Sequence, residues 1–485
     1  MFKERNKRSE KSLVKNSTLN VIKQISTLAF SLVTFPYVSR VIGSANYGKY
    51  SFAASIVEYL LLIAGAGSGT YAIREGARYR DNKSREEKFC SEIFSLNIIT
   101  TIIAYAILAI LFIFWGKLKS YADVLTVLSI RIVATTIGVE WIFSIYEDYL
   151  NITIRQIITQ LVGLVLTLVL VRNETDYVLY AVATVVAMSG ANVVNLFISR
   201  RYVNLHFTLQ ISKKHFKPVV YILFYSAMMT IYASSDITMM GILSTDRNVG
   251  IYSVASKIYG MAKNVFIAAM VPLIPRISYE FGQNDTKKIH EIVDKATTLM
   301  IALVVPCSVL LAIYSKETII FISGYQYADG SGALRILSLA LIFVFFGTIY
   351  TSGIMLPRRQ ERYITILATV SALCNVLLNL FFIPWLLSTG AAITTLVAEA
   401  IVGIGSMLYS WEYVNFHIIK VNLIKCLCPC AIFILVYFVM LKIISYDIIR
   451  LFVGGGISVI LLITYYLLAD KNQFYSIVSM IRGKK

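Results

Sequence analysis

Basic side chains inside long apolar segments are the residues of this sequence best suited to chemistry. A charged side chain at the centre of a bilayer costs about 2.5 to 3.5 kcal/mol on insertion scales, so such residues usually face a protein interior or a water-filled path. In a passage of low dielectric constant, fixed ammonium and guanidinium groups can replace water around a phosphate. The candidates for binding an anionic group are Lys23, Lys257, Lys263, Arg131 and Arg335.

Each basic candidate also has a simpler interpretation. Lys23 lies near the edge of its apolar segment, where a lysine can extend its amine to the headgroup region. Arg131 and Arg335 could instead pair with Glu140 or another acid and fix helix packing. Three further basic residues lie so close to segment ends that extension to the interface is the better interpretation: Arg155, Lys425 and Arg450.

Helical spacing places other polar residues beside these charges. The segment 15–39 carries a polar stripe at i, i+4 and i+7, which continues along the segment and comprises Asn16, Asn20, Lys23, Thr27, Ser31 and Thr34. Hydroxyl, amide and aromatic groups suit sugars, so the candidates for sugar contact are Asn20, Tyr221, Tyr225, Tyr232 and Asn264. Packing against lipid is an equal interpretation of the three tyrosines. Lys257 and Asn264 share a helix face, whereas Lys263 points elsewhere.

Acidic residues within apolar segments raise the question of an energy source. Asp236 and Glu58 are the candidates for ion coupling, because a carboxylate that gains and loses a proton could link transport to a proton or sodium gradient. The alternative for both is a permanent pair with a nearby lysine. The sequence contains no G-x-x-x-x-G-K-[ST] phosphate loop, so ATP hydrolysis is not expected. Its histidines and cysteines lack metal-ligand spacing, so we predict no metal, no cofactor and no catalytic residue.

The elements that position these residues follow from composition. Of 485 residues, 57% are hydrophobic and 15% charged, and the mean hydropathy is +0.71, whereas soluble domains carry about 25% charged residues. Stretches such as "LVGLVLTLVLV" (161–171) do not alternate, so helices rather than barrel strands are expected. The predicted fold is an all-α integral membrane protein with about fourteen transmembrane helices, at 15–39, 48–73, 89–115, 122–146, 152–172, 177–199, 218–243, 249–275, 293–314, 331–356, 363–386, 389–412, 422–441 and 447–469.

The positions of the basic residues predict the orientation of these helices. The net charge is +18, and Lys and Arg gather in "REGARYRDNKSREEK" (74–88), at the N-terminus and in "RGKK" (482–485). Lys and Arg in short loops stay cytoplasmic, so both termini are predicted to be cytoplasmic. Nucleic-acid binding is the alternative source of such a charge, but this distribution favours topology and contact with anionic membrane lipids.

A repeated phrase indicates how the helices are organised. "YGKYSFAASI" (47–56) returns as "VGIYSVASKI" (249–258), and each copy begins the second span of a six-helix set. An even number of spans between the copies preserves orientation, which predicts two parallel six-helix lobes. The predicted domains are an N-lobe at 1–212, a C-lobe at 213–413, and two C-terminal helices with a tail at 414–485.

Four stretches together resemble the Wzx-type polysaccharide flippases of the multidrug/oligosaccharidyl-lipid/polysaccharide export superfamily. They are "YGKYSFAASIVEYLLLIAGAGSGTYAIREGAR" (47–78), "WIFSIYEDYLNITIRQI" (141–157), "SSDITMMGILSTDRNVGIYSVASKI" (234–258) and "LCNVLLNLFFIPWLLSTGAAITTLVAEA" (373–400). Ser144 departs from the family, which more often has glutamine there. The resemblance implies a MATE-like pair of lobes in the bacterial cytoplasmic (inner) membrane, which moves an undecaprenyl-pyrophosphate-linked oligosaccharide from the cytoplasmic to the outer leaflet by alternating access. It also implies a cavity lined with basic residues, and polysaccharide polymerase and chain-length proteins as partners.

Other functions on a similar sequence stay open. A multidrug exporter for cationic amphiphiles has the same fold, but the excess of basic over acidic residues within the spans favours an anionic substrate. Charge does not separate an oligosaccharide carrier from a flippase for lipid II. A membrane polysaccharide polymerase or ligase would be an enzyme with a substantial outer loop, whereas the longest predicted outer loop, "SKETIIFISGYQYADGS" (315–331), is short and partly apolar.

Overall fold

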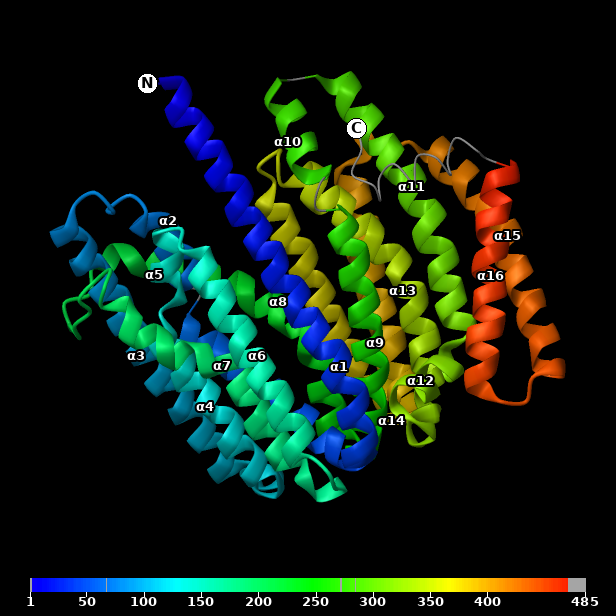
Figure 1. The fold of residues 1–485 in the computed structure, drawn as a ribbon, viewed down its shortest axis with the longest axis horizontal. Coiled ribbons are helices and arrows are strands. Elements are labelled where there is room, and N and C mark those ends of the chain that lie inside the picture. The colour runs from blue at the N-terminus through cyan, green and yellow to red at the C-terminus, as the bar shows by residue number, and fades with distance from the viewer. Residues whose placement is uncertain (1, 67, 271–272, 284, 470–485) are drawn as a thin grey trace. The chain divides into compact units, whose positions relative to one another are not determined.

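The computed structural model describes residues 2–66, 68–270, 273–283 and 285–469, and of residues 2–15 and 17 the backbone alone. The described chain consists of helices and the turns that join them (Figure 1), which confirms the predicted all-α class. Eleven of the described helices are long and apolar enough to cross a membrane, or twelve if one bent pair counts as a single span. The basic residues predicted at 482–485 lie outside the described part.

The expected number of about fourteen spans agrees roughly with this count, because two continuous helices each cover two predicted spans. Helix α1 (Phe2–Gly65) has a non-helical residue at Gly43, with φ 75° and ψ 167°, between the spans predicted at 15–39 and 48–73. Helix α14 (Glu361–Tyr409) has one at Leu387, with φ 51° and ψ −127°, between 363–386 and 389–412. Glycine adopts a positive φ at little cost, whereas Leu387 does so against its side chain.

The chain divides into two compact units, 1–238 and 239–485. The division falls inside α8 (Phe216–Leu243), later than the boundary predicted at 212/213. The other helices of the first unit are α2 (Ser68–Gly76), α3 (Lys83–Phe114), α4 (Ala122–Gly138), α5 (Glu140–Ile145), α6 (Tyr149–Leu170) and α7 (Tyr177–Ser199), with short 3₁₀ turns at Gly116–Tyr121, Glu174–Asp176 and Lys213–His215.

The second unit holds the remaining helices. They are α9 (Asp246–Met270), α10 (Leu273–Gln283), α11 (Thr286–Ile313), α12 (Ser315–Ser323), α13 (Ser331–Tyr350), α14, α15 (Phe416–Ile443) and α16 (Asp447–Ala469), with 3₁₀ turns at Tyr325–Gly330 and Trp411–Tyr413 and a π-helical turn at Thr351–Met355. Helices α9 and α10 form the bent pair, at 40° to each other. Together they cover the span predicted at 249–275.

Small residues let the helices approach closely. A Cβ added to Gly163 of α6 would lie 2.4 Å from the Cβ of Ala187 on α7, and one added to Gly403 of α14 would lie 2.7 Å from the carbonyl oxygen of Phe343 on α13. Such contacts are typical of membrane helices, because lipid tails are as apolar as leucine and close backbone packing is what holds the helices together.

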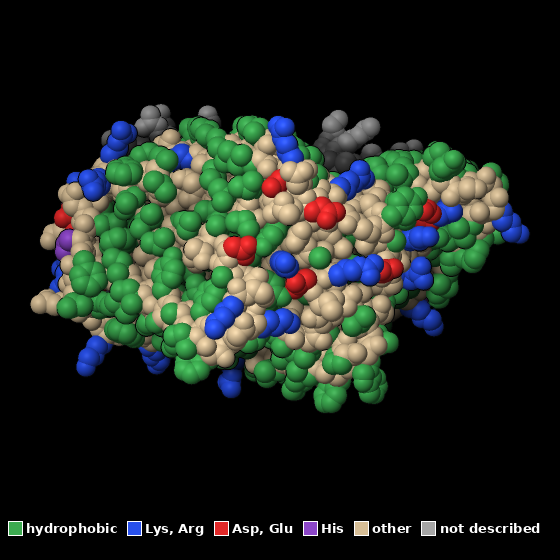
Figure 2. All heavy atoms as spheres, turned by 90° about the horizontal axis from the view of Figure 1, so that it is seen from below, with side chains coloured by type: hydrophobic (Ala, Val, Ile, Leu, Met, Phe, Trp, Pro, Cys, Tyr) green, Lys and Arg blue, Asp and Glu red, His purple; other side chains and the backbone are tan. Residues whose placement is uncertain are grey.

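The surface is as apolar as a bilayer environment requires. Trp385 is 85% exposed and Phe381 is 69% exposed, and both belong to α14. Figure 2 shows hydrophobic side chains over much of one face, with Lys, Arg, Asp and Glu side chains gathered between them. The number of apolar helices and this surface make the chain a multi-pass membrane protein.

Candidate functional site

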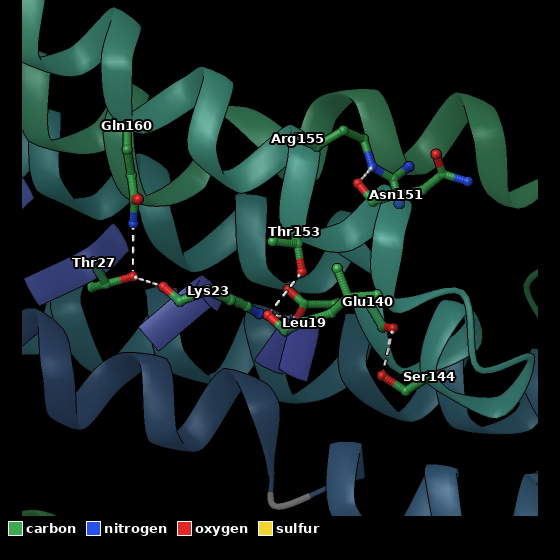
Figure 3. Close-up of polar contacts among 9 residues, drawn as sticks. All are labelled: Leu19, Lys23, Thr27, Glu140, Ser144, Asn151, Thr153, Arg155 and Gln160. Carbon is green, nitrogen blue, oxygen red and sulfur yellow. Dashed lines mark hydrogen bonds and ion pairs between the residues drawn. The ribbon is translucent and has the colours of Figure 1, made fainter. Parts of the chain in front are cut away.

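Part of the polar stripe of α1 faces α6 of the first unit, and Lys23 reaches the first residue of α5 (Figure 3). The Nζ atom of Lys23 lies 2.5 Å from Oε1 of Glu140, and their side chains are 27% and 42% exposed. Glu140 is the first residue of α5, directly after Val139, which ends α4 with a left-handed φ of 37°. This break turns the chain at the start of α5 and brings Glu140 to α1.

Gln160 of α6 continues the contact with α1 one turn deeper. Its side-chain nitrogen donates to the hydroxyl of Thr27 at 2.8 Å, and its oxygen accepts from Ser26 at 3.0 Å. Thr153, also on α6, donates to the backbone oxygen of Leu19 at 3.3 Å. Interhelical hydrogen bonds of this kind contribute about 0.6 kcal/mol each on average. The stripe is therefore partly occupied inside the first unit, although Asn20 on the same helix is exposed.

A second ion pair joins α4 to the later part of α1. The guanidinium of Arg131 lies 2.9 Å from Oε1 of Glu58, and the two side chains are 16% and 44% exposed. Arg131 therefore pairs with Glu58 and not with Glu140. One basic candidate and one candidate for ion coupling thus pair with each other. An acidic partner was the alternative for Arg131, whereas the partner expected for Glu58 was a lysine.

In the second unit, Lys263 points into the protein. Its Nζ atom lies 2.6 Å from Oε1 of Glu399 on α14, and the hydroxyl of Tyr259 donates to the same oxygen at 2.7 Å. The side chain of Glu399 is only 5% exposed, so its charge depends on these two partners.

Lys257 has different surroundings from Lys263 on the same helix. Lys257 and Asn264 are both exposed. No acidic side chain forms an ion pair with Lys257 among the described residues, whereas Lys263 faces Glu399. Six residues at 100° each separate the two lysines by about 120° on an ideal helix, which accounts for the difference. Lys257 is thus an exposed cation on α9 without an ion-pair partner among the described residues.

The remaining candidates lie on α8 and α13. Asp236 is 7% exposed, whereas Tyr221 is 58% exposed and Tyr225 is 36% exposed. Tyr232 is half-buried on the same helix. Arg335 of α13 is exposed, and no acid pairs with it in the described part of the chain.

Two of the arginines predicted to extend to the interface are buried instead, so that prediction was wrong for both. Arg155 is 9% exposed, donates from Nε to the backbone oxygen of Asn151 at 2.9 Å (Figure 3), and stacks 4.2 Å from the ring centre of Phe143. Arg450 is 6% exposed and pairs with Glu317 at 2.9 Å and with Asp447. Both side chains therefore turn toward neighbouring protein groups and not toward the lipid headgroups.

Two family models match the chain. The model described as "Polysaccharide biosynthesis protein" matches residues 13–280, which is more than half of the chain, and the model described as "MatE" matches residues 222–385. The chain belongs to the polysaccharide biosynthesis protein family.

Curated proteins are also similar to this member of the polysaccharide biosynthesis protein family. A "Putative O-antigen transporter" of Escherichia coli K12 is 22% identical over 400 residues, which cover 81% of this chain and 95% of the relative. A "Probable low-salt glycan biosynthesis flippase" of Haloferax volcanii is 25% identical over 171 residues, which cover 35% of this chain and 36% of the relative.

Solved structures share the fold of this family member. The lipid II flippase MurJ in an inward closed conformation superposes with a TM-score of 0.70 at 16% identity, over 97% of this chain and 100% of that chain. An inward-facing multidrug resistance MATE transporter superposes with a TM-score of 0.58 at 15% identity, over 82% and 97% of the two chains. The fold is therefore that of the superfamily that the sequence resembles.

Several contacts of this polysaccharide biosynthesis family member were missed from the sequence. Gln160 was not singled out, although Thr153 and Thr167 lie seven residues before and after it and mark a polar face of the same helix. The partner of Lys23 was missed because a helix break at a valine, Val139, leaves no sequence signal. Among the described residues, no group of three or more His, Cys, Asp or Glu side chains is placed to hold a metal ion.

Proposed function

We propose that this protein is a flippase that moves undecaprenyl-pyrophosphate-linked oligosaccharide repeat units from the cytoplasmic to the outer leaflet. The relatives support a lipid-linked glycan as the substrate, since two of them are named O-antigen transporters and one a glycan biosynthesis flippase. The observation that carries the proposal is Lys257, an exposed cation on α9 with no acidic partner in the described chain. A diphosphate would supply the negative counter-charge that Lys257 lacks within the described chain.

Four of the five basic candidates then divide into two groups, while Arg335 lies in a separate pocket between α11, α13 and α15. Lys257 is the first candidate for direct contact with the diphosphate, with Asn264 on the same face for a sugar hydroxyl. Lys23, Lys263 and Arg131 each hold an acid, so a phosphate can bind them only by competing with that acid. Asn20, Tyr221, Tyr225 and Tyr232 remain candidates for sugar contact.

Alternating access needs a source of free energy, and an ion gradient is the proposed one. Asp236 is the first candidate for coupling, because it is an acidic residue that is only 7% exposed and belongs to a helix long and apolar enough to span a membrane. Glu58 is the weaker candidate, since it already forms an ion pair with Arg131.

The proposed location is the bacterial inner membrane, with both termini in the cytoplasm. The distribution of Lys and Arg supports this orientation. Polysaccharide polymerase and chain-length proteins are the proposed partners, because they would consume the product on the outer side.

The experiment is glycan display in a bacterial host that lacks its own polysaccharide flippase and produces a matching lipid-linked repeat. We expect the wild-type protein to restore surface polymer. Lys257→Gln should reduce it at equal membrane abundance, and Lys420→Gln is the matched control because Lys420 is also an exposed lysine on a helix of the second unit.

Two results would contradict the proposal at different levels. No surface polymer despite membrane expression and a matching substrate would reject an oligosaccharide flippase and favour export of lipid II or of drugs on the same fold. Wild-type amounts of surface polymer with Lys257→Gln would be compatible with a flippase but would reject the proposed role of Lys257.

A further inference from the structure

The second unit contains an open pocket that the proposed function does not use. It lies between α11, α13 and α15 and has a volume of about 330 Å³. Its wall is formed by Arg335 and Leu339 of α13, by Ile434, Tyr437 and Phe438 of α15, and by three apolar residues near the end of α11. The volume is at the lower end of the range of small-molecule sites, about 300 to 1,000 Å³.

The pocket lies near the ends of three helices and combines one cation with apolar side chains, some of which lie deeper along α13 and α15. Arg335 is the fifth residue of α13, which begins at Ser331, so its backbone lies about 6 Å from the helix end at 1.5 Å per residue. Leu339 lies one turn deeper, and Ile434 lies nine residues from the end of α15 at Ile443. One cation near a helix end, with apolar side chains one or more turns deeper, matches a phospholipid, whose phosphate would lie at the cation and whose acyl chain would lie along the apolar side chains.

The charge of Arg335 is not satisfied by the neighbouring acids. The hydroxyl of Tyr437 donates to Glu317 at 3.1 Å, and Nε of Arg450 donates to the same carboxylate oxygen at 2.9 Å. Asp447 is bound by Arg450 as well. Glu317 and Asp447 are therefore already bound by other side chains. No acid pairs with Arg335 in the described residues.

We propose that this pocket binds one anionic phospholipid of the surrounding leaflet, with its phosphate on the Arg335 guanidinium and part of an acyl chain against Leu339, Ile434 and Phe438. Arginine suits this role because its planar fork can donate two parallel hydrogen bonds to a phosphate. A single guanidinium matches the single charge of a phosphodiester better than the higher charge of a diphosphate. In the proposed topology the pocket faces the outer leaflet.

The experiment counts the lipids that the purified protein retains by native mass spectrometry. The protein is exchanged into detergent that contains phosphatidylglycerol, phosphatidylcholine or undecaprenyl diphosphate. We expect the wild type to keep one phosphatidylglycerol preferentially and Arg335→Gln to keep it about fivefold less, the scale for one basic residue at an anionic membrane surface. Arg172→Gln, which removes an exposed arginine at the end of α6, is the matched control and should behave as the wild type.

A second variant tests the apolar part of the site. Leu339→Trp keeps the charge and fills the pocket, and it should fold because Leu339 is 39% exposed. We expect the same loss of phosphatidylglycerol as in Arg335→Gln. Equal retention by the wild type and Arg335→Gln, or an equal loss in Arg172→Gln, would overturn the proposal. Preferential retention of undecaprenyl diphosphate over phosphatidylglycerol would overturn it as well, because the site would then belong to the carrier lipid.

Discussion

The hydroxyl groups of Tyr252 and Thr395 lie 3.2 Å apart and join α9 to the later part of α14. In the first unit, Tyr50 donates to Thr184 at 3.3 Å and joins α1 to α7. Tyr50 and Tyr252 occupy the same place in the two repeated phrases, and each contacts the sixth predicted span of its own set. The repeat in the sequence is therefore a repeat of contacts inside each unit.

We predict that Tyr252→Phe destabilises the protein by about 1 kcal/mol, because the ring stays packed and Thr395 loses one hydrogen bond. Tyr50→Phe should have a similar effect. Thermal unfolding in detergent, followed by size-exclusion fluorescence, measures both changes. Tyr225→Phe is the control, since Tyr225 is 36% exposed and should tolerate the change. If Tyr252→Phe and Tyr50→Phe both unfold at the wild-type temperature, these two hydrogen bonds do not contribute to stability.

The two lysines of α9 should respond differently to substitution. Lys263→Gln leaves the buried carboxylate of Glu399 with Tyr259 as its remaining partner, so we expect a loss of roughly 1 to 3 kcal/mol. The double variant Lys263→Gln with Glu399→Gln should recover most of that loss, because no charge is then left unpaired. Lys257→Gln should leave the unfolding temperature unchanged. The contrary result is a double variant that is less stable than Lys263→Gln alone.

The cluster around Arg450 should be among the most sensitive sites of the second unit. Arg450→Gln leaves Glu317, whose side chain is 0% exposed, without its cation, and breaking a buried pair typically costs about 3 to 5 kcal/mol. Arg247→Gln is the control, since Arg247 and its partner Asp329 are 59% and 68% exposed and such a pair contributes about 0 to 1 kcal/mol. Protein yield and unfolding temperature in detergent compare the two. Equal effects of the two variants would contradict the burial argument.

Close helix packing gives a further matched pair. Gly163→Val places a side chain where Ala187 already lies, so we expect a loss of about 1 to 3 kcal/mol. Gly260→Ala meets no atom within 4 Å and improves helix propensity, so stability should be unchanged or slightly higher. Thermal unfolding of both variants in one detergent is the measurement. A Gly163→Val protein as stable as Gly260→Ala would show that α6 and α7 separate without cost.

Ion coupling predicts a functional change without a structural one. Asp236→Asn should abolish uptake driven by an imposed proton or sodium gradient in proteoliposomes, because an amide cannot gain and lose a proton. Its unfolding temperature should stay close to the wild type, since asparagine keeps the size and most of the hydrogen-bonding capacity of aspartate. Asp329→Asn, an exposed acid, serves as the control. Gradient-driven transport at the wild-type rate in Asp236→Asn would reject this role.

The helices could be predicted from the sequence because each needs an apolar run of about 20 residues, and such runs are visible without any knowledge of partners. The lysines of α9 show how far this reasoning extends into the site. Helical geometry placed Lys257 and Lys263 on different faces, and the structure gives them different surroundings. It could not identify Glu399 as the partner of Lys263, because that residue lies 136 positions further along the chain.

Positions near helix ends were the least predictable. Arg155 and Arg450 were expected to extend into the interface, and both are buried. The error has a physical cause, since depth along a helix can be read from the sequence whereas rotation about its axis depends on neighbours. Phe143 of the short helix α5 covers Arg155, and Glu317 of α12 binds Arg450. Neither neighbour could be identified from the sequence around the two arginines.

The contact between Glu317 and Arg450 also has a consequence for biosynthesis. The two residues are 133 positions apart, and at a synthesis rate of about 5 to 20 residues per second Arg450 follows Glu317 by on the order of 10 s. During that interval Glu317 has no guanidinium partner, and a buried carboxylate without a counter-charge destabilises the helices around it. The last two helices are therefore required to complete the second unit, and a ribosome that stops before α16 releases a chain whose earlier helices are not yet fully stabilised.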